Sequence, residues 1–234
     1  MSKKSRIKIQ LQEIKRILLY CLIATFVSCT NSNEFGLKGD VKSYFERHYE
    51  VEKKLGKWEI GDIEYYGRHH RVTFDKKGLY QEIEYFDADL NLTGKSFPIR
   101  ENGKVVEEII HDEGFQFKII FEHVSKNEYY YESFNSDEKK TVQGKTILKN
   151  GKVVKQIGTI MTNETENETY TTLFEYDKNG NLIFQKETNK KGEIRSFRFE
   201  YLEFDAKKNW TKRLTFRDDN DVPINIEIRE IEYH

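Results

Sequence analysis

Residues 176–182 read Tyr176-Asp177-Lys178-Asn179-Gly180-Asn181-Leu182, an order of residue types that suits a tight chain reversal. The aromatic residue can end one strand, and the aspartate can bond the backbone of the turn that follows. Asn-Gly tolerates the left-handed backbone of a tight reversal, and the apolar residue can start the return strand. This stretch therefore predicts a β-hairpin.

The same order of residue types recurs along the chain. Related segments begin at Phe74, Phe86 and Phe204. Other turn signals, including Asn102-Gly103 and Asn150-Gly151, lie between them. The spacing is roughly 13 residues, close to that of short consecutive strands. Beyond residue 70 the sequence therefore predicts a train of hairpins.

Between the turns, apolar and polar residues alternate. Phe115, Phe117, Ile119 and Phe121 share one face of a predicted strand. A period of two is typical of half-buried strands. The 14% aromatic content and the two prolines also favour strands. The segment from Val51 to Gly61 lacks this alternation and predicts a short helix or an irregular loop.

We therefore expect an all-β fold. It would be a long antiparallel meander of repeated hairpins, forming a strongly twisted and partly rolled sheet. Open sheets of more than about ten strands tend to curl or split. A closed barrel or a sandwich is accordingly the alternative. Residues 37–234 are expected to form this single β-repeat domain.

The N-terminal segment predicts export and anchoring. Basic residues from Lys3 to Arg16 precede an apolar run from Ile17 to Ser28. This is the order of a secretion signal, and the run is shorter than the roughly 20 apolar residues of a spanning helix. Cys29 follows at once. An ordinary secretory signal with an incidental cysteine is the alternative.

Val27-Ser28-Cys29 resembles the lipobox of bacterial lipoproteins, although Phe26 stands where an aliphatic residue is usual. The resemblance implies a signal peptide at 1–28, lipidation of Cys29 and a short linker within 29–36. It also implies a lipid-anchored protein of the outer membrane, with the periplasmic or extracellular face left open.

The recurring turn motif resembles the tyrosine-aspartate (YD/RHS-like) repeats, and more closely the repeat-bearing lipoproteins of diderm bacteria. The resemblance covers roughly residues 37 to 233. Several units lack the glycine or the asparagine, and the segment from Lys139 to Ile160 matches poorly. The repeat is therefore degenerate.

Charge and cysteine content exclude several functions. Residues 1–28 hold six Lys/Arg and one acidic residue, so their removal changes the net charge from −1 to −6. A surface of that charge does not favour nucleic acid, whose binding depends on basic side chains. Cys21 would leave with the signal and Cys29 would carry lipid. No disulfide, thiol nucleophile or cofactor is then expected.

Candidate catalytic and metal-binding groups are few. Adjacent strand residues point to opposite faces, so His69 and His70 predict surface histidines and no metal site. The sequence also contains three carboxylate pairs, Glu82 with Glu84, Glu107 with Glu108, and Asp218 with Asp219. In a chain with 34% charged residues they predict a solvated face. We therefore expect no catalytic residues and no enzyme.

Consecutive tyrosines suggest a binding surface. Neighbouring rings in a strand must lie on both faces, and a solvent-facing ring can stack on a sugar or anchor a protein. The candidate contacts are Tyr65, Tyr66, Tyr129 and Tyr131. The alternative is that a curled sheet covers both faces.

The sequence thus predicts a membrane-anchored, non-catalytic binding or scaffold module that acts through a wide sheet face. Its expected partners are the membrane, through the lipid, and an envelope protein or glycan. A glycan-acting hydrolase and an immunity- or chaperone-like partner of a secreted protein are the alternatives. The oligomeric state is left open.

Overall fold

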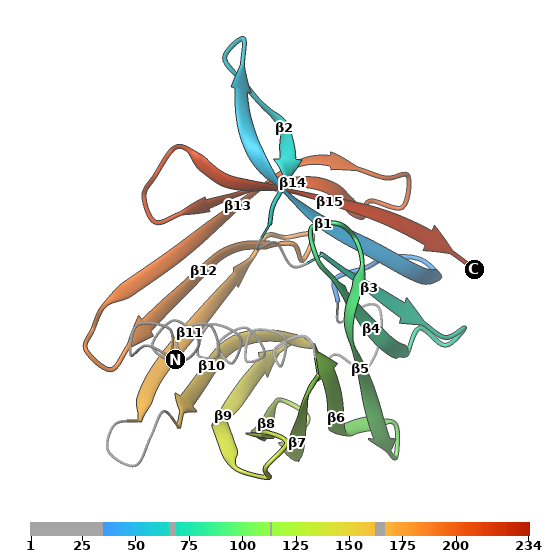
Figure 1. The fold of residues 1–234 in the computed structure, drawn as a ribbon, viewed down its shortest axis with the longest axis vertical. Helices are drawn as coiled ribbons and strands as arrows, with labels where there is room; N and C mark the ends of the chain where they lie inside the picture. The colour runs from blue at the N-terminus through green and yellow to red at the C-terminus, as the bar shows by residue number, and fades with distance from the viewer. Residues whose placement is uncertain (1–34, 66–68, 113, 162–166) are drawn as a thin grey trace.

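A computed structural model of the chain describes residues 35–65, 69–112, 114–161 and 167–234. The predicted signal peptide, Cys29, most of the linker and Tyr66 lie outside the described residues. All regular structure in the described part is β-strand, and this part contains no helix long and apolar enough to cross a membrane. Figure 1 shows the strands surrounding a common interior.

The fifteen strands are β1 (Val41–Lys54), β2 (Lys57–Ile63), β3 (His69–Phe74), β4 (Tyr80–Phe86), β5 (Leu92–Glu101), β6 (Lys104–Asp112), β7 (Phe115–Ser125), β8 (Glu128–Phe134), β9 (Lys140–Lys149), β10 (Lys152–Ile160), β11 (Glu168–Tyr176), β12 (Leu182–Asn189), β13 (Ile194–Phe204), β14 (Trp210–Arg217) and β15 (Pro223–Tyr233).

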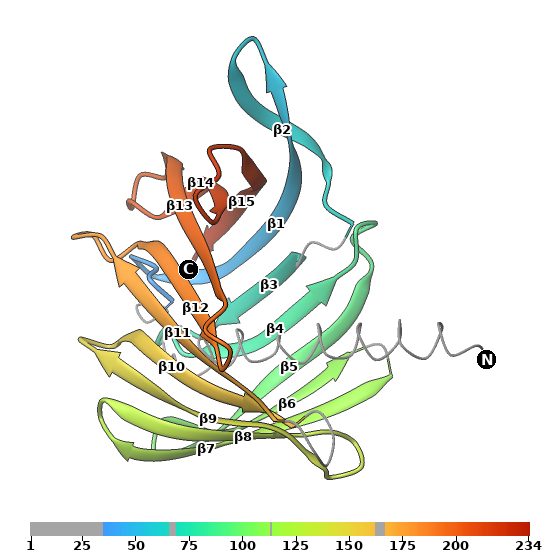
Figure 2. The ribbon, with the colours of Figure 1, turned by 90° about the vertical axis from the view of Figure 1, so that its left-hand side faces the viewer.

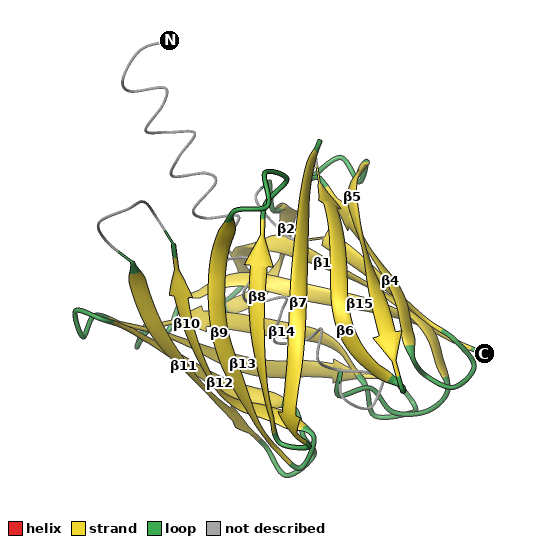
Figure 3. Cartoon of the chain, turned by 90° about the horizontal axis from the view of Figure 1, so that it is seen from below, coloured by secondary structure: helices red, strands yellow, loops and turns green. Residues whose placement is uncertain are grey.

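The sheet closes on itself. From β3 to β15 each strand pairs antiparallel with the next, and β15 pairs with β1. β1 also pairs with β3, so fourteen strands form a closed barrel and β2 lies outside the ring. Figures 2 and 3 show the strands side by side around the wall. The expectation of an all-β antiparallel meander is confirmed. The partly rolled sheet is corrected to a closed barrel, the stated alternative, and of the described strands only β2 keeps an unpaired edge.

β1 serves two purposes along its length. Its first part pairs with β3 between Ser43 and Glu46, and its far end pairs with β2 between Tyr49 and Lys54. The β1–β2 hairpin therefore extends beyond the ring, as Figure 1 shows at the top. The expectation of a helix or irregular loop from Val51 to Gly61 is wrong, because cross-strand pairing decided the structure of a segment with weak alternation.

The hairpin turns use the predicted chemistry. Asp177 Oδ1 accepts hydrogen bonds from the backbone N–H groups of Asn179 and Asn181, both at 2.8 Å. The same pattern of side-chain acceptor and backbone donors occurs in the turns that begin at Asp75, Asn135, Asn189 and Asp205. This local bonding sets the length of each reversal. A buried or half-buried aromatic residue precedes most of these turns.

Asn-Gly pairs form two kinds of turn. Asn102-Gly103 and Asn150-Gly151 have positive φ at both residues, as a type I′ hairpin requires. At Asn179-Gly180 only the glycine has positive φ, at 85°. The third pair therefore belongs to a longer turn, in which Asp177 accepts the backbone hydrogen bonds of Asn179 and Asn181.

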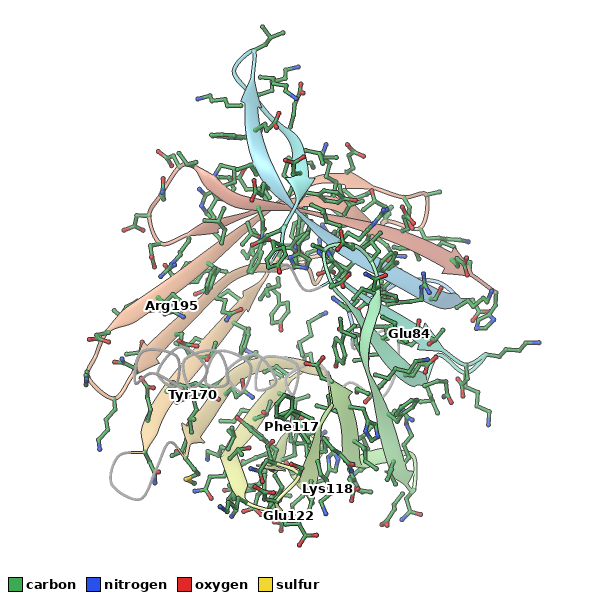
Figure 4. The ribbon with its side chains drawn as sticks, in the orientation of Figure 1. Glu84, Phe117, Lys118, Glu122, Tyr170 and Arg195 are labelled. Carbon is green, nitrogen blue, oxygen red and sulfur yellow. The ribbon has the colours of Figure 1, made fainter. Side chains whose placement is uncertain are left out.

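From β4 to β11 the apolar face of the wall points inward. Tyr80, Ile110, Ile119 and Ile160 are each at most 1% exposed. Figure 4 shows Phe117 on the inner side of β7 and its neighbours Lys118 and Glu122 on the outer side. The alternation predicted from Phe115 to Phe121 is confirmed, and in this part the sheet has rolled onto its apolar face.

At β14 and β15 the polarity of the two faces is reversed. Leu214 and Ile226 are paired on the outer face, and Arg213 and Glu227 are paired on the inner face. The outer residues are nevertheless buried, because Val51 and Trp58 of the β1–β2 hairpin pack against the cluster of Leu214, Phe216 and Ile226. A hairpin outside the ring thus covers an apolar outer face.

The segment before β1 contacts residues near the C-terminal end of the chain. Phe35, assigned to the linker by sequence, packs edge-on against Phe74 with ring centroids 5.4 Å apart. The amide of Asn209 donates to the carbonyl of Lys38 at 2.8 Å and to Tyr233 Oη at 2.7 Å. Phe35 therefore packs into the core cluster of the barrel.

Replacing Ile226 by alanine should lower the free energy of unfolding by about 2–5 kcal/mol, because the side chain is 0% exposed and its removal leaves a cavity. Urea unfolding measures this loss. Ile224→Ala is the matched control, since Ile224 is 44% exposed in the same strand and should cost less than about 1 kcal/mol. Equal losses in the two variants would contradict the packing of the hairpin over the outer face.

Candidate ligand cavity and buried charge cluster

The barrel encloses a cavity of about 270 Å³. Its lining comes from both sides of the wall, with residues of β1, β3 and β4 facing residues of β10 to β15. Aromatic rings supply much of this lining, namely Tyr44, Tyr85, Phe174, Tyr176, Phe199, Tyr201 and Trp210. Mainly apolar enclosure with a few polar groups is the usual character of a small-molecule site.

A charge cluster lies at the seam between β1 and β15. Arg229 Nε donates to Glu46 Oε2 at 2.6 Å, and Arg213 forms an ion pair with Glu227. Thr215 Oγ1 also donates to Glu227, at 2.5 Å. The two carboxylates and two guanidinium groups balance in charge, so burial leaves none of the four without a counterion.

Aromatic rings hold the two arginines in place. The guanidinium carbon of Arg229 lies 3.8 Å from the ring centroid of Trp210 and 4.6 Å from that of Tyr44. Arg213 lies 4.4 Å from the centroid of Trp210 and 4.8 Å from that of Phe199. A planar guanidinium stacks well on such rings while its edge remains available for carboxylates. Ring stacking as well as ion pairing therefore holds the two arginines.

The cluster shifts the pKa values of its members. Burial alone would raise the pKa of Glu46, but Arg229 beside it holds that pKa well below its usual value. Burial would lower the pKa of His48, but the carboxylates of Glu46 and Glu227 raise it overall. The surroundings of His48 thus favour a positive charge at the imidazole.

Glu46, His48 and His70 form a group with metal-binding side chains. One ligand-type atom from each lies within 4.8 Å of the others. Glu46 and His48 are two residues apart on β1 and share its inner face, and His70 is paired with Glu46 across β3. The sequence-based expectation of surface histidines is wrong, since His70 faces the cavity and His69 is 0% exposed.

His69 has a structural setting of its own. Its Nδ1 accepts the backbone N–H of His48 at 3.1 Å, and its Nε2 lies 3.2 Å from the carbonyl oxygen of Glu64. Burial lowers the pKa of His69, which favours the neutral ring that these two contacts require. The two adjacent histidines therefore have separate surroundings, as strand geometry predicts.

A second buried group lies between β4, β5 and β6. Ser96 Oγ donates to Glu108, and Arg100 Nη2 donates to the carbonyl of Tyr80 at 2.5 Å. Burial raises the pKa of Glu108 to about 8, although Tyr80 and Arg100 act in the opposite direction. Glu108, which the sequence predicted to lie on a solvated face with Glu107, is therefore inside the barrel, and that expectation is wrong for it.

The other carboxylate pair on a shared face behaves as expected from sequence. Glu82 and Glu84 lie on the outer side of β4, and Lys95 Nζ contacts them at 3.3 Å and 2.8 Å. A surface ion pair of this kind satisfies both carboxylates and encloses no cleft. It gives no support to a hydrolase at this position.

The predicted tyrosine surface is only partly on the outside. Tyr129 and Tyr131 are each 1% exposed and face inward, so their assignment to a solvent-facing surface is corrected. Gln156 Nε2 donates to Tyr131 Oη at 3.1 Å, and the ring lies over Gly144, which has no side chain to obstruct it. Tyr65 is 74% exposed. Whether any of these tyrosines binds a partner remains a prediction.

Sequence reasoning missed the charge cluster. The pattern Glu46-x-His48 places both side chains on one strand face and was a readable signal. Its partners come from β3, β14 and β15, and the last two lie more than 160 residues away. Only the closure of the barrel brings them together.

Comparisons with known proteins give fold similarity alone. No protein-family model and no curated protein matches the chain. A porin-like protein from Bacteroides vulgatus ATCC 8482 is similar with a TM-score of 0.51 at 11% identity, over 83% of this chain and 99% of that one. A porin-like protein from Bacteroides uniformis ATCC 8492 has a TM-score of 0.45 at 8% identity, over 84% and 98%.

The pKa of Glu108 predicts a pH dependence of stability. Between the ordinary value of 4.5 and about 8, the folded state holds a proton that the unfolded chain has lost. The free energy of unfolding should therefore fall as pH rises through this window, and Glu108→Gln should reduce this decline. Urea unfolding at about pH 5 and about pH 8 measures both effects.

Glu107→Gln is the matched control, because Glu107 is the neighbouring residue on the outer face of β6. It should retain the decline seen in the wild-type protein. If Glu108→Gln and the wild-type protein lose stability equally between the two pH values, the buried protonated carboxyl is excluded.

Proposed function

We propose that this protein is a lipid-tethered, non-catalytic β-barrel of the cell envelope that binds a small anionic, ring-bearing molecule in its interior. The cavity carries this proposal, since it joins aromatic walls to fixed cations. We place the binding site on the inner face, whereas the sequence predicted a wide sheet face with solvent-facing tyrosines. The location and the tether remain parts of the proposal.

The outer wall supports a barrel in water. Lys118, Lys145, Lys155 and Lys186 occupy outward positions away from the strand ends. A lysine on the lipid face costs about 2–4 kcal/mol near the bilayer midplane, so four cost on the order of 10 kcal/mol. This is comparable with the whole stability of a typical domain. Exposed apolar residues lie beside charged ones: Leu173 pairs with Lys155 and Lys186, and Ile120 pairs with Glu107.

The inner wall gives no support to a water-filled channel. Among the described residues, the inward side chains of Tyr80, Tyr129, Tyr131 and Gln156 are each at most 2% exposed. A conducting barrel has a polar interior open to water. Here packed rings and aliphatic side chains leave an enclosed cavity as the space for a ligand.

The charges of the cavity favour an anion. Its lining contains three cationic residues, Lys152, Arg213 and Arg229. Glu46 and Glu227 balance the two arginines, so the charge of Lys152 is in excess. Lys152 Nζ lies 5.2 Å from the ring centroid of Tyr176, so a positive charge and an aromatic face adjoin each other. A molecule with a flat ring and one negative group would contact both.

The tether follows from the resemblance at Cys29. Each buried CH₂ of an acyl chain contributes about 0.8 kcal/mol, so several chains together hold a protein firmly. Without residues 1–28 the chain has a net charge of −6 and would not bind anionic lipid through its surface. Attachment would depend on the lipid.

Exchanging residues 1–29 for a cleavable secretion signal without a cysteine should release the barrel into the soluble envelope fraction without detergent. The wild-type protein should remain with the membranes until detergent is added. Fractionation followed by immunoblotting measures both, and mass spectrometry of the wild-type N-terminus tests acylation of Cys29. A barrel that stays with the membranes after the exchange would contradict a wall in water.

The cavity should bind the anionic probe 1-anilinonaphthalene-8-sulfonate in preference to the neutral probe N-phenylnaphthylamine, because the charge of Lys152 is in excess there. Leu182→Trp should reduce this binding at least fivefold by filling space. Fluorescence titration measures the dissociation constants. Ile183→Trp is the control, since Ile183 is 37% exposed and does not line the cavity. Equal binding by both variants would place the probe elsewhere, and thermal melts check that both fold.

A further inference from the structure

We propose that Glu46, His48 and His70 bind one divalent transition-metal ion of the Zn²⁺ type. Two imidazole nitrogens and one carboxylate oxygen form a common ligand set for zinc when a fourth position is left for water or a ligand. The three ligand-type atoms lie within 4.8 Å of one another. The inference goes beyond ligand binding, since the ion would bind without an organic molecule in the cavity.

The contact between Glu46 and His48 has the dimensions of a metal site. His48 Nε2 lies 3.3 Å from Glu46 Oε1. Two ligands at about 2.0–2.1 Å from a tetrahedral ion are separated by roughly this distance. The same nitrogen is buried and has no partner in hydrogen-bond geometry. The separation of this nitrogen from Glu46 Oε1 therefore suits two ligands of one ion.

The backbone fixes all three ligands. Glu46 and His48 project from one face of β1, which pairs with β15 at both residues and with β3 at Glu46. His70 is the direct cross-strand partner of Glu46 on β3, and such partners have Cβ atoms about 4.5–5.5 Å apart. Little movement is required to bring the third ligand to bonding distance. Ligands on paired strands are held more firmly than ligands on loops.

Neighbouring side chains can orient the ligands. Arg229 occupies Glu46 Oε2 at 2.6 Å, which leaves Oε1 for the ion. Tyr44 Oη lies 3.3 Å from His70 Nε2 and can orient this ring. Such hydrogen bonds to metal ligands fix their orientation.

The charges around the site do not prevent binding. Arg213 Nη2 is 4.0 Å from Glu46 Oε1, beyond hydrogen-bond distance, and is neutralised by Glu227. The ion would thus enter surroundings of zero net charge. All three ligand residues line the cavity, so the remaining coordination position would face it.

Equilibrium dialysis of the purified full-length protein against Zn²⁺, with metal analysis, should give one tightly bound ion per chain. His48→Gln and His70→Gln should each weaken binding at least tenfold. Co²⁺ should give the strong visible bands of a four-coordinate site in the wild-type protein and not in these variants. Zn²⁺ should also raise the melting temperature of the wild-type protein alone.

His111→Gln is the matched control, because His111 lies on the outer face of β6 and is exposed. It should bind the ion as the wild-type protein does. If the wild-type protein binds no more Zn²⁺ than His48→Gln and His70→Gln do, Glu46 and His48 form an ion pair only and the metal site is excluded. The metal result and the fluorescent-probe result are independent, so either proposal can fail while the other stands.

Discussion

The pairing of the first strand with the last is the constraint on which the rest of the structure depends. A sheet of this many strands has two edges that expose unpaired backbone groups, unless it closes. Here β1 and β15 pair along their length, with Val41 opposite Tyr233 at one end and Tyr49 opposite Ile226 at the other. This seam encloses the cavity, brings Glu46 to Arg229, and gives the β1–β2 hairpin its position over the outer face.

The local part of the fold could be predicted from sequence because its causes are local. Asp177 bonds the turn that it begins, and Phe117 alternates with charged neighbours along one strand. Neither feature depends on residues far away in the chain. These patterns directly predicted that each turn signal joins two consecutive strands and that neighbouring strands are antiparallel.

Closure and the choice of inner face could not be predicted in the same way. Alternation assigns two faces to a strand but does not say which one points inward. At β14 the apolar residues Leu214 and Phe216 lie outside and are buried by Trp58, which comes from a hairpin that sequence assigned to a helix or loop. His70 appeared to be a surface residue for the same reason, since its partner Glu46 was known only once β1 and β3 were paired.

The charge cluster gives the seam its register. In the observed pairing Glu46 faces Arg229 and His48 faces Glu227, so each contact joins opposite or complementary groups. A slip of two residues keeps every side chain on its own face and is therefore the error that hydrophobic patterning cannot prevent. One such slip places Glu46 opposite Glu227, and the other places His48 opposite Arg229.

Both slips bring like charges together, or leave a buried charge without its partner, at a cost of several kcal/mol. An apolar seam would tolerate them, since Ile226, Ile228 and Ile231 are similar in shape. Buried charge at this position therefore adds specificity more than stability. It also explains why a polar cluster occurs where the two ends of the chain meet, and why the chemistry available to the cavity is concentrated at the same seam.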